Sequence, residues 1–176
     1  TVAAYLVAKA IGSKNLTAIL MPEEGLTKDK NIKDAIEIAK KLKVNYTIVP
    51  INSAMGFFEE IKLNAHFKTK LYAIANAKAR IRMAILYYFA NISNALVIGT
   101  SDKSEIALGY TTKYGDNASD ILVIGDLWKT EVIGLGKFLG VPKNILKKKP
   151  SAELIRNIDA EKELGAPYEL LDQILK

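Results

Sequence analysis

The hydrophobic positions of the chain follow two rhythms that alternate along its 176 residues. In segment 28–43 apolar residues return every three or four positions among lysines and acids, which predicts an amphipathic helix. Short apolar runs bounded by polar or turn residues predict buried strands at 16–21, 46–51 and 95–99. Further helices are predicted, in chain order, over 2–12, 71–92, 127–140 and 166–176.

Strands that alternate with helices in this way predict an α/β fold. Parallel strands need crossover connections, which helices provide, so we expect a doubly wound parallel sheet flanked by helices on both faces. The length fits a single domain over residues 1–176. Ligands of such sheets bind beyond the carboxyl ends of the strands. The polar segment 99–121, "GTSDKSEIALGYTTKYGDNASDI", directly follows a predicted strand and is therefore the first candidate for a site.

Segment 71–92, "LYAIANAKARIRMAILYYFANI", is helical in propensity and apolar on nearly all sides. A helix of this kind cannot turn one face to water. It is either a central core helix or a helix covered by its own sheet on one side and by a second copy of the chain on the other, and we prefer the second interpretation. Arg80 and Arg82 point about 200° apart around this helix. We therefore expect them to have separate roles.

The composition, with 49% hydrophobic and 25% charged residues, is that of an ordinary soluble globular protein. Cysteine is absent, which excludes disulfides and thiolate metal sites and suits a reducing cytoplasm. The net charge of +6 is spread along the chain, with one dense run at 147–149. This predicts attraction for anionic ligands such as nucleotides rather than for nucleic acid. No apolar run reaches the roughly 20 residues that cross a bilayer, so we expect no membrane partner and a cytoplasmic location.

Several residues in and near segment 99–121 could carry chemistry. An acid such as Glu105, placed after a strand, can hold Mg²⁺, which prefers hard oxygen ligands. The alternative is a plain helix start capped by Ser101 or Asp102. Lys129, on the first turn of a predicted helix, could place its ammonium against a phosphate. Segment 113–120, "KYGDNASD", is long and polar enough to be a binding loop rather than a simple surface loop.

Three common kinds of site are disfavoured by the sequence. The chain has no phosphate loop of the "GxxxxGK[ST]" or "GxGxxG" type. Its one histidine, His66, has no Cys, Asp or Glu at ligand spacing. We therefore expect neither a zinc site nor a histidine-dependent catalytic triad.

Six motifs in a fixed order resemble the ammonia-dependent NAD synthetases, a family within the adenine-nucleotide alpha-hydrolase group of ATP pyrophosphatases. In chain order they are "LMP" (20–22), "NAKARIRM" (76–83), the whole of 99–121, "GDLWKTEV" (125–132), "LGVPKNILKKKPSAEL" (139–154) and "KELGAPYELLDQIL" (162–175). The resemblance implies a ligase that forms a C–N bond. The carboxylate of deamido-NAD would attack the α-phosphate of ATP and release pyrophosphate, and ammonia would then displace AMP to give NAD.

The resemblance also implies roles for individual residues. Glu105 matches a magnesium ligand, and the ATP contacts match Thr100, Lys129 and Ser151, with Lys129 on the phosphates. The residues that match deamido-NAD contacts are Arg80, Lys113 and Asp120. No side-chain nucleophile is required. The family forms homodimers, largely through the helix predicted at 71–92, which agrees with burial of that helix on two sides.

The sequence departs from the family pattern in three places. An "SGGxDS" loop, which would bind pyrophosphate and supply a second magnesium acid, is expected directly before Thr1 but is not in the sequence. A His-Lys pair expected after Lys176 is likewise outside it, so we expect a chain truncated at both ends. Asn157 and Ile158 stand where the family often has Gly-Gln. Two other functions stay open, namely another ATP pyrophosphatase, such as a GMP synthetase or a tRNA-thiolating enzyme, and a non-catalytic nucleotide-binding module.

Overall fold

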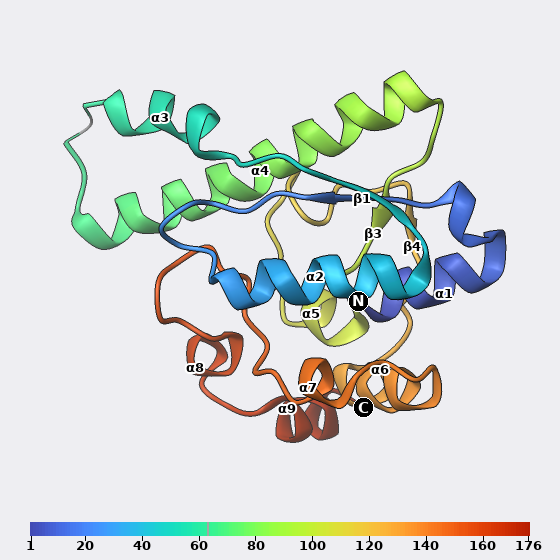
Figure 1. Cartoon of the computed structure of the whole chain (residues 1–176). Helices are drawn as coiled ribbons and strands as arrows, with labels where there is room; N and C mark the ends of the chain where they lie inside the picture. Colours follow the sequence, from blue (N-terminus) through green and yellow to red (C-terminus); the bar gives the residue numbers. More distant parts are fainter. Residues whose placement is uncertain (63) are drawn as a thin grey trace.

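The computed structural model describes residues 1–62 and 64–176, and its helices surround short parallel strands (Figure 1). The first half of the chain contains α1 (Val2–Ile11), a 3₁₀ turn (Ser13–Asn15), β1 (Thr17–Leu20), α2 (Asp29–Leu42), β2 (Asn45–Ile48), α3 (Asn52–Glu60) and α4 (Phe67–Ser93). The second half contains β3 (Ile98–Gly99), α5 (Lys103–Ala107), β4 (Ile121–Leu122), α6 (Lys129–Phe138), α7 (Lys143–Leu146), α8 (Ala160–Leu164) and α9 (Tyr168–Leu175).

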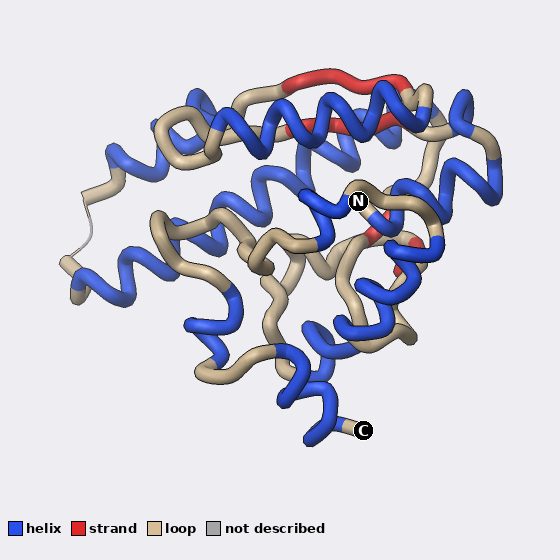
Figure 2. The backbone as a smooth tube through the Cα atoms, turned by 60° about the horizontal axis from the view of Figure 1, so that its bottom comes forward, coloured by secondary structure: helices blue, strands red, loops and turns tan. Residues whose placement is uncertain are grey.

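Strands are found at the three predicted places, and the pairing among the described residues is parallel. The predicted burial is wrong for β2, because Tyr46 and Ile48 are 37% and 42% exposed. Strand β1 pairs with β2 from Thr17 opposite Asn45 to Leu20 opposite Ile48, and β3 pairs with β4. The strands are shorter than the apolar runs suggested, and they form two separate pairs (Figure 2). The α/β class with a parallel sheet and flanking helices is therefore confirmed, with a small sheet.

Local sequence explains where the main helices begin and end. Helix α2 carries the apolar face predicted for 28–43 and ends where Lys43 takes a left-handed backbone with φ 54°. Gly12, with φ 84°, ends α1 as expected, because a residue without Cβ adopts this region freely. The predicted starts at 127 and 166 lie two residues early, since α6 and α9 begin at Lys129 and Tyr168.

The main core lies between α1, α2 and α6. Its buried side chains come from these helices and from the segments that follow β4 and α6: Val2, Tyr5, Ile38, Ile124, Val132 and Val141. This packing explains the spacing of apolar residues in the predicted helices 2–12, 28–43 and 127–140. It also holds the first turn of α6, which carries Lys129, at a fixed place beside the strands.

Helix α4 is longer than predicted and is not a core helix of the single chain. It spans 27 residues, yet its buried positions are Ala75, Lys78, Ala79 and Ala90. Tyr88 and Ile92, near its end, are 64% and 68% exposed. The central-core interpretation of segment 71–92 is therefore wrong, and one side of this apolar helix faces outward. None of the helices in the described ranges is long and apolar enough to cross a membrane.

Candidate active site

The candidate site lies where β3 and β4 end side by side. Ile98 is opposite Ile121, and Gly99 is opposite Leu122 in the parallel ladder. The segments that leave the two strands lead to α5 and α6, and the Lys103 N–H donates to the Leu127 carbonyl at 2.9 Å to join their starts. Two helix N-termini therefore meet at the carboxyl edge of the sheet, where α/β proteins bind ligands.

Helix α5 begins with a reciprocal cap between two acids. Asp102 Oδ1 accepts the Glu105 N–H at 3.0 Å, and Glu105 Oε2 accepts the Asp102 N–H at 3.1 Å. Of the two capping residues considered from the sequence, Asp102 is the one that caps the helix. This arrangement fixes both carboxyl groups through the backbone of a single helical turn.

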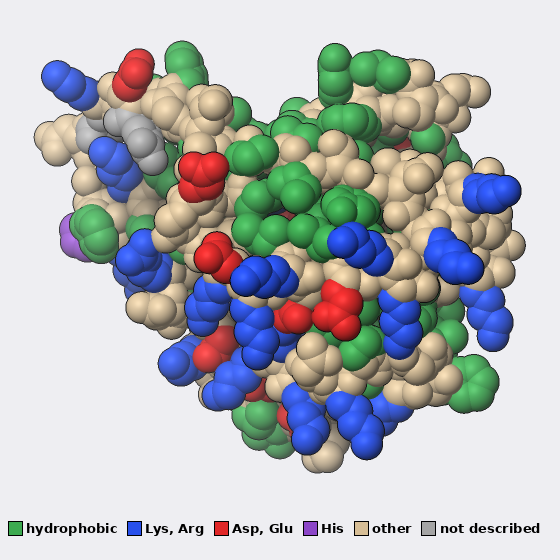
Figure 3. Space-filling view, in the orientation of Figure 1, with side chains coloured by type: hydrophobic (Ala, Val, Ile, Leu, Met, Phe, Trp, Pro, Cys, Tyr) green, Lys and Arg blue, Asp and Glu red, His purple; other side chains and the backbone are tan. Residues whose placement is uncertain are grey.

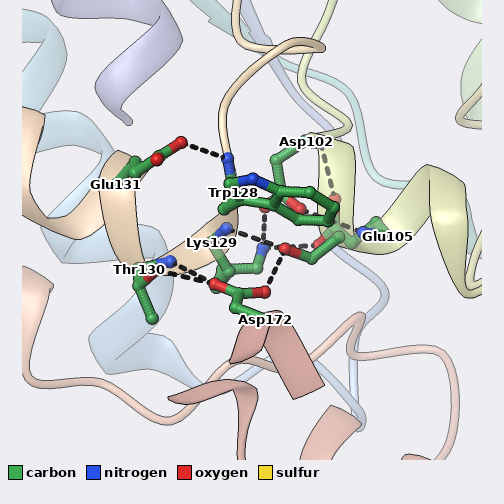
Figure 4. Close-up of polar contacts among 8 residues, drawn as sticks. Asp102, Glu105, Trp128, Lys129, Thr130, Glu131 and Asp172 are labelled. Carbon is green, nitrogen blue, oxygen red and sulfur yellow. Dashed lines mark hydrogen bonds and ion pairs between the residues drawn. The ribbon is translucent and has the colours of Figure 1, made fainter. Parts of the chain in front are cut away.

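Lys129 from α6 reaches both of these acids. Its Nζ lies 2.6 Å from Glu105 Oε1 and also forms an ion pair with Asp102, whose side chain is 1% exposed (Figure 4). Burial by itself would lower the pKa of Lys129, but the Glu105 and Asp102 carboxylates outweigh it and raise this pKa. Burial raises the pKa of Glu105, and the Lys129 charge opposes that shift. The ammonium also lies 5.1 Å from the ring centre of Tyr168 in α9.

A second polar group lies directly behind this ion pair and involves α9. Asp172 Oδ1 accepts the Ser104 hydroxyl at 2.5 Å, and Asp172 Oδ2 accepts both the Thr130 N–H at 2.9 Å and the Thr130 hydroxyl at 2.8 Å. Ser104 Oγ in turn accepts the Lys129 N–H at 2.8 Å. The group therefore joins α5, α6 and α9 at the residues next to Glu105 and Lys129 (Figure 4).

The residues matched to deamido-NAD do not form a single cluster. Arg80 Nε donates to the backbone carbonyl of Lys113 at 3.2 Å, so these two exposed residues are in contact. Asp120 is engaged elsewhere, because Oδ2 accepts the Val97 N–H at 2.7 Å and Oδ1 accepts the Tyr87 hydroxyl at 3.1 Å. In this structure Asp120 ties α4 to the residues that enter β3.

The two remaining matched residues, Thr100 and Ser151, are both exposed. Thr100 directly follows β3 at the carboxyl edge. Ser151 lies in a separate segment, where its hydroxyl donates to the Ile158 carbonyl at 3.1 Å and accepts the Glu153 N–H. Ser151 thus supports its own loop rather than the Lys129 ion pair.

The loop that carries Ser151 is tied to α2 and α4. Lys148 forms an ion pair with Asp34 in α2, and the Lys78 ammonium of α4 donates to the Leu154 carbonyl at 3.1 Å. The same Lys78 ammonium lies 2.9 Å from Glu23 Oε2.

Arg82 donates from Nε to the Met21 carbonyl at 3.1 Å. Arg80 and Arg82 therefore have separate contacts, as their spacing predicted.

Comparison with known proteins places the chain among nucleotide-dependent ligases. The sequence profile of the family described as NAD synthase matches residues 1–176. The chain belongs to the NAD synthase family. It is 47% identical over 173 residues to the NH(3)-dependent NAD(+) synthetase of Archaeoglobus fulgidus, covering 98% of this chain and 68% of that protein. It is 48% identical over 176 residues to the protein of the same name from Methanococcus aeolicus, covering 98% of this chain and 67% of that one.

Solved structures of the NAD synthase family share the fold. The NMN synthetase of Francisella tularensis superposes with a TM-score of 0.88 at 36% identity, covering 99% of this chain and 71% of that one. The NH3-dependent NAD synthetase of Campylobacter jejuni gives a TM-score of 0.73 at 37% identity, covering 84% of this chain and 63% of that one. The chain thus spans about two thirds of the length of these relatives. The family resemblance inferred from the motifs is confirmed.

Sequence reasoning missed three members of the site. No role was assigned to Ser104, Thr130 or Asp172, although each lies inside a motif that carries the NAD synthase resemblance. A signal for Asp172 was present, because residues 168, 171, 172 and 175 share one face of a helix. An acid on an otherwise apolar face needs a buried partner. Which partner it has depends on tertiary structure, since Ser104 is 68 residues away.

Proposed function

We propose that the protein is an ATP-dependent ligase that converts deamido-NAD and ammonia into NAD, with release of AMP and pyrophosphate. The observation that carries the proposal is the Lys129 ammonium, held between Asp102 and Glu105 at the carboxyl edge of the strands. The membership of the chain in the NAD synthase family supports the same reaction. The cytoplasmic location and the single domain over 1–176 belong to this proposal as well.

The reaction requires groups that neutralise phosphate. In the first step a carboxylate oxygen of deamido-NAD bonds to the α-phosphorus of ATP, and the bond from that phosphorus to the bridging oxygen breaks, which releases pyrophosphate. In the second step the ammonia nitrogen bonds to the carbonyl carbon, loses a proton, and AMP leaves. An anion attacks a polyanion in the first step, so a cation fixed beside the phosphates lowers the barrier.

Lys129 has the properties that this role needs. Its raised pKa keeps the ammonium charged at neutral pH, and its backbone N–H is fixed by Ser104. The side chain can exchange a carboxylate for a phosphate oxygen without a change of charge state. Helix α1 packs with α6 in the main core through Val2 and Val132. A loop that precedes Thr1, as the resemblance expects, would therefore join the chain near the helix that carries Lys129.

The acids of the site suit magnesium only as a partial ligand set. Among the residues that the structure describes, no three His, Cys, Asp or Glu side chains are grouped to hold a metal ion. Glu105, with a side chain that is 22% exposed, can offer one hard oxygen, and Mg²⁺ commonly takes its other ligands from water and phosphates. We therefore assign Glu105 to hold the ion, which when bound would neutralise phosphate charge.

Arg80 and Lys113 are proposed to bind the dinucleotide. Arg80 uses Nε on the Lys113 carbonyl, which leaves the two terminal nitrogens of its guanidinium for a ligand phosphate. Lys113 is exposed, and its ammonium lies 5.0 Å from the ring centre of Tyr114. Asp120, Thr100 and Ser151 stay proposed contacts on the family pattern alone, because their present contacts do not point to a ligand.

A homodimer through α4 is part of the proposal. An apolar groove of about 570 Å³ runs along this helix and is lined by Val49, Ala54, Ile81, Ala84, Ile85, Tyr88 and Phe89. Hydrophobic side chains also gather at the upper edge of the face in Figure 3, whereas Lys and Arg gather across its middle and lower part. A second copy would cover the groove with the matching apolar surface of its own α4.

A second candidate substrate follows from one comparison. The structure with a TM-score of 0.88 is described as an NMN synthetase, whose product is the mononucleotide. The reacting groups would be the same, and the acid substrate would be nicotinate mononucleotide. The two substrates differ in the adenylate half, so they are told apart by their relative turnover.

The proposal is tested with the full-length protein, ATP, Mg²⁺ and ammonia, supplied with either deamido-NAD or nicotinate mononucleotide. Chromatography would measure the amide product and AMP in each reaction. We expect NAD and AMP in equal amounts, with deamido-NAD the preferred substrate. NMN as the main product would favour the second candidate. Binding of ATP without formation of either amide would contradict both and favour a non-catalytic module.

A further inference from the structure

Asp172 is a buried acid, and both of its carboxylate oxygens accept hydrogen bonds. It lies in α9 with 2% of its surface exposed, and it accepts hydrogen bonds from the Ser104 hydroxyl, the Thr130 N–H and the Thr130 hydroxyl. Burial raises the pKa of Asp172, but these three hydrogen bonds outweigh it and lower the pKa below the ordinary value. The group is therefore an anion held in one orientation.

The partners of Asp172 are the immediate neighbours of the two charged site residues. Ser104 precedes Glu105, and Thr130 follows Lys129. Because the Ser104 hydroxyl donates a hydrogen bond to Asp172, the Ser104 oxygen is free to accept the Lys129 N–H at 2.8 Å. The Asp172 carboxylate therefore orients the Ser104 hydroxyl, which joins the α5 turn of Glu105 to the α6 turn of Lys129.

Capping of α6 explains only part of this arrangement. Ser104 Oγ and Asp172 Oδ2 accept the N–H groups of Lys129 and Thr130, the first two residues of α6, whereas Glu131 Oε2 accepts the Trp128 N–H that precedes the helix. Asp172 also reaches α5 through its second oxygen, which a cap of α6 would not require. Ser104, like Asp172, is fully buried, so both polar groups lose water and depend on each other.

We propose that Asp172 is a positioning residue for the reaction. Through Ser104 and Thr130 it sets the Lys129 ammonium and the Glu105 carboxylate at the spacing that transfer of the adenylyl group from ATP needs. The inference rests on the proposed function, in which Lys129 binds the phosphates of ATP. Asp172 itself touches no substrate. Its effect should therefore fall on ATP and leave the pyridine substrate nearly unaffected, because Arg80 and Lys113 belong to a different contact.

The test compares Asp172→Asn with Ser104→Ala, the double variant and the control Glu131→Gln in the full-length protein. Asparagine keeps the size of the side chain but replaces one carboxylate oxygen with an NH2 group, so a donor now faces either Ser104 or Thr130, each of which donates to a different oxygen of Asp172. Glu131→Gln changes a charged cap on the same helix without touching Ser104. For each protein, calorimetry gives the Kd for ATP, steady-state kinetics give kcat and both KM values, and a thermal melt reports stability.

Because hydrogen bonds to a charged group are lost, we expect Asp172→Asn to lower kcat/KM for ATP on the order of tenfold or more. The KM for the pyridine substrate should stay within about twofold, and the double variant should be no worse than the poorer single variant. Glu131→Gln should leave the ATP parameters near wild type.

The outcomes separate this inference from the proposed function. A lower melting temperature in Asp172→Asn with unchanged Kd, kcat and KM for ATP would make Asp172 a merely structural residue and overturn the inference. Equal losses in Glu131→Gln would do the same. If the wild type binds ATP but forms no amide, the proposed ligase function fails, and a tenfold weaker Kd for ATP in Asp172→Asn would still support the positioning role. A wild type that binds no ATP overturns both.

Discussion

Replacement of Lys129 by Met removes one charge from the centre of the site and leaves its shape nearly unchanged. Met keeps most of the apolar stem, so the change isolates the ammonium. Two carboxylates then lose their cation: that of Asp102, whose side chain is 1% exposed, and that of Glu105, which lies 2.6 Å from Nζ. Removing one partner of a buried ion pair leaves an uncompensated buried charge.

The expected loss is large but does not unfold the protein. Breaking a buried pair costs about 3–5 kcal/mol, whereas an exposed pair contributes about 0–1 kcal/mol. The range of about 3–5 kcal/mol applies here because both side chains of the Lys129–Asp102 pair are largely buried. Domains of this size have about 5–15 kcal/mol of stability, and each kcal/mol shifts the midpoint by about 2–4 °C. We therefore expect a folded variant that melts roughly 6–20 °C lower.

The loss should also depend on pH in a definite direction. The Lys129 charge lowers the pKa of Glu105 against the effect of burial, so its removal raises that pKa further. A group whose folded pKa lies above its unfolded pKa stabilises the fold below the unfolded value, and this stabilisation is lost as pH rises through the folded pKa. The stability deficit of Lys129→Met should consequently be larger at pH 7 than at pH 5.

Urea unfolding of the wild type, Lys129→Met, Asp102→Asn and the double variant measures these effects. Asparagine still caps α5 but carries no charge, so the double variant should recover part of the loss, with a coupling of about 0.5–3 kcal/mol. A loss below about 1 kcal/mol for Lys129→Met, or strictly additive losses in the double variant, would refute the assignment of a buried charge cluster.

Three further predictions concern other parts of the molecule. Glu105→Gln should lower magnesium-dependent NAD formation roughly a hundredfold or more while the dimer stays intact, and activity within a few fold of wild type would remove Glu105 from the metal site. Gly99→Ala should cost about 1–3 kcal/mol in urea unfolding, because its Cβ would lie 2.5 Å from a side-chain atom of β4, whereas Gly56→Ala, inside α3, meets nothing within 4 Å and should stabilise by about 0.5–1 kcal/mol. Tyr88→Glu should halve the mass seen by light scattering, while Phe138→Glu, at a residue 81% exposed on α6, should not; a wild-type monomer would contradict the α4 interface.

The sequence predicted the helices with strong periodicity and missed α3 and the three shortest α-helices. Helix α2 was expected at 28–43 and spans Asp29–Leu42, because its apolar stripe continues for four turns. Helices α5, α7 and α8 have four or five residues each, which is too short for a 3.6-residue period to be recognised. The apolar pattern of α4 suggested more burial than the chain provides, because Tyr88 and Ile92 stay exposed.

The site was predictable where function is local and not where it depends on packing. Glu105 and Lys129 stood out because an acid and a lysine at the starts of helices next to strands suit phosphate chemistry. Asp120 was matched by family pattern to a substrate, yet it bonds the Val97 N–H and the Tyr87 hydroxyl. Asp172 acts across 68 residues on Ser104, a distance that no local motif reports.

The central claim is that this chain forms an amide with ATP through an adenylated acid, and one measurement tests it most directly. The full-length protein is incubated with deamido-NAD, ATP, Mg²⁺ and ¹⁵N-labelled ammonia, and mass spectrometry follows NAD and AMP. We predict ¹⁵N in the amide of NAD, one AMP formed for each NAD, and loss of both in Lys129→Met. ATP consumption to ADP, or no labelled amide despite ATP binding, would contradict the account.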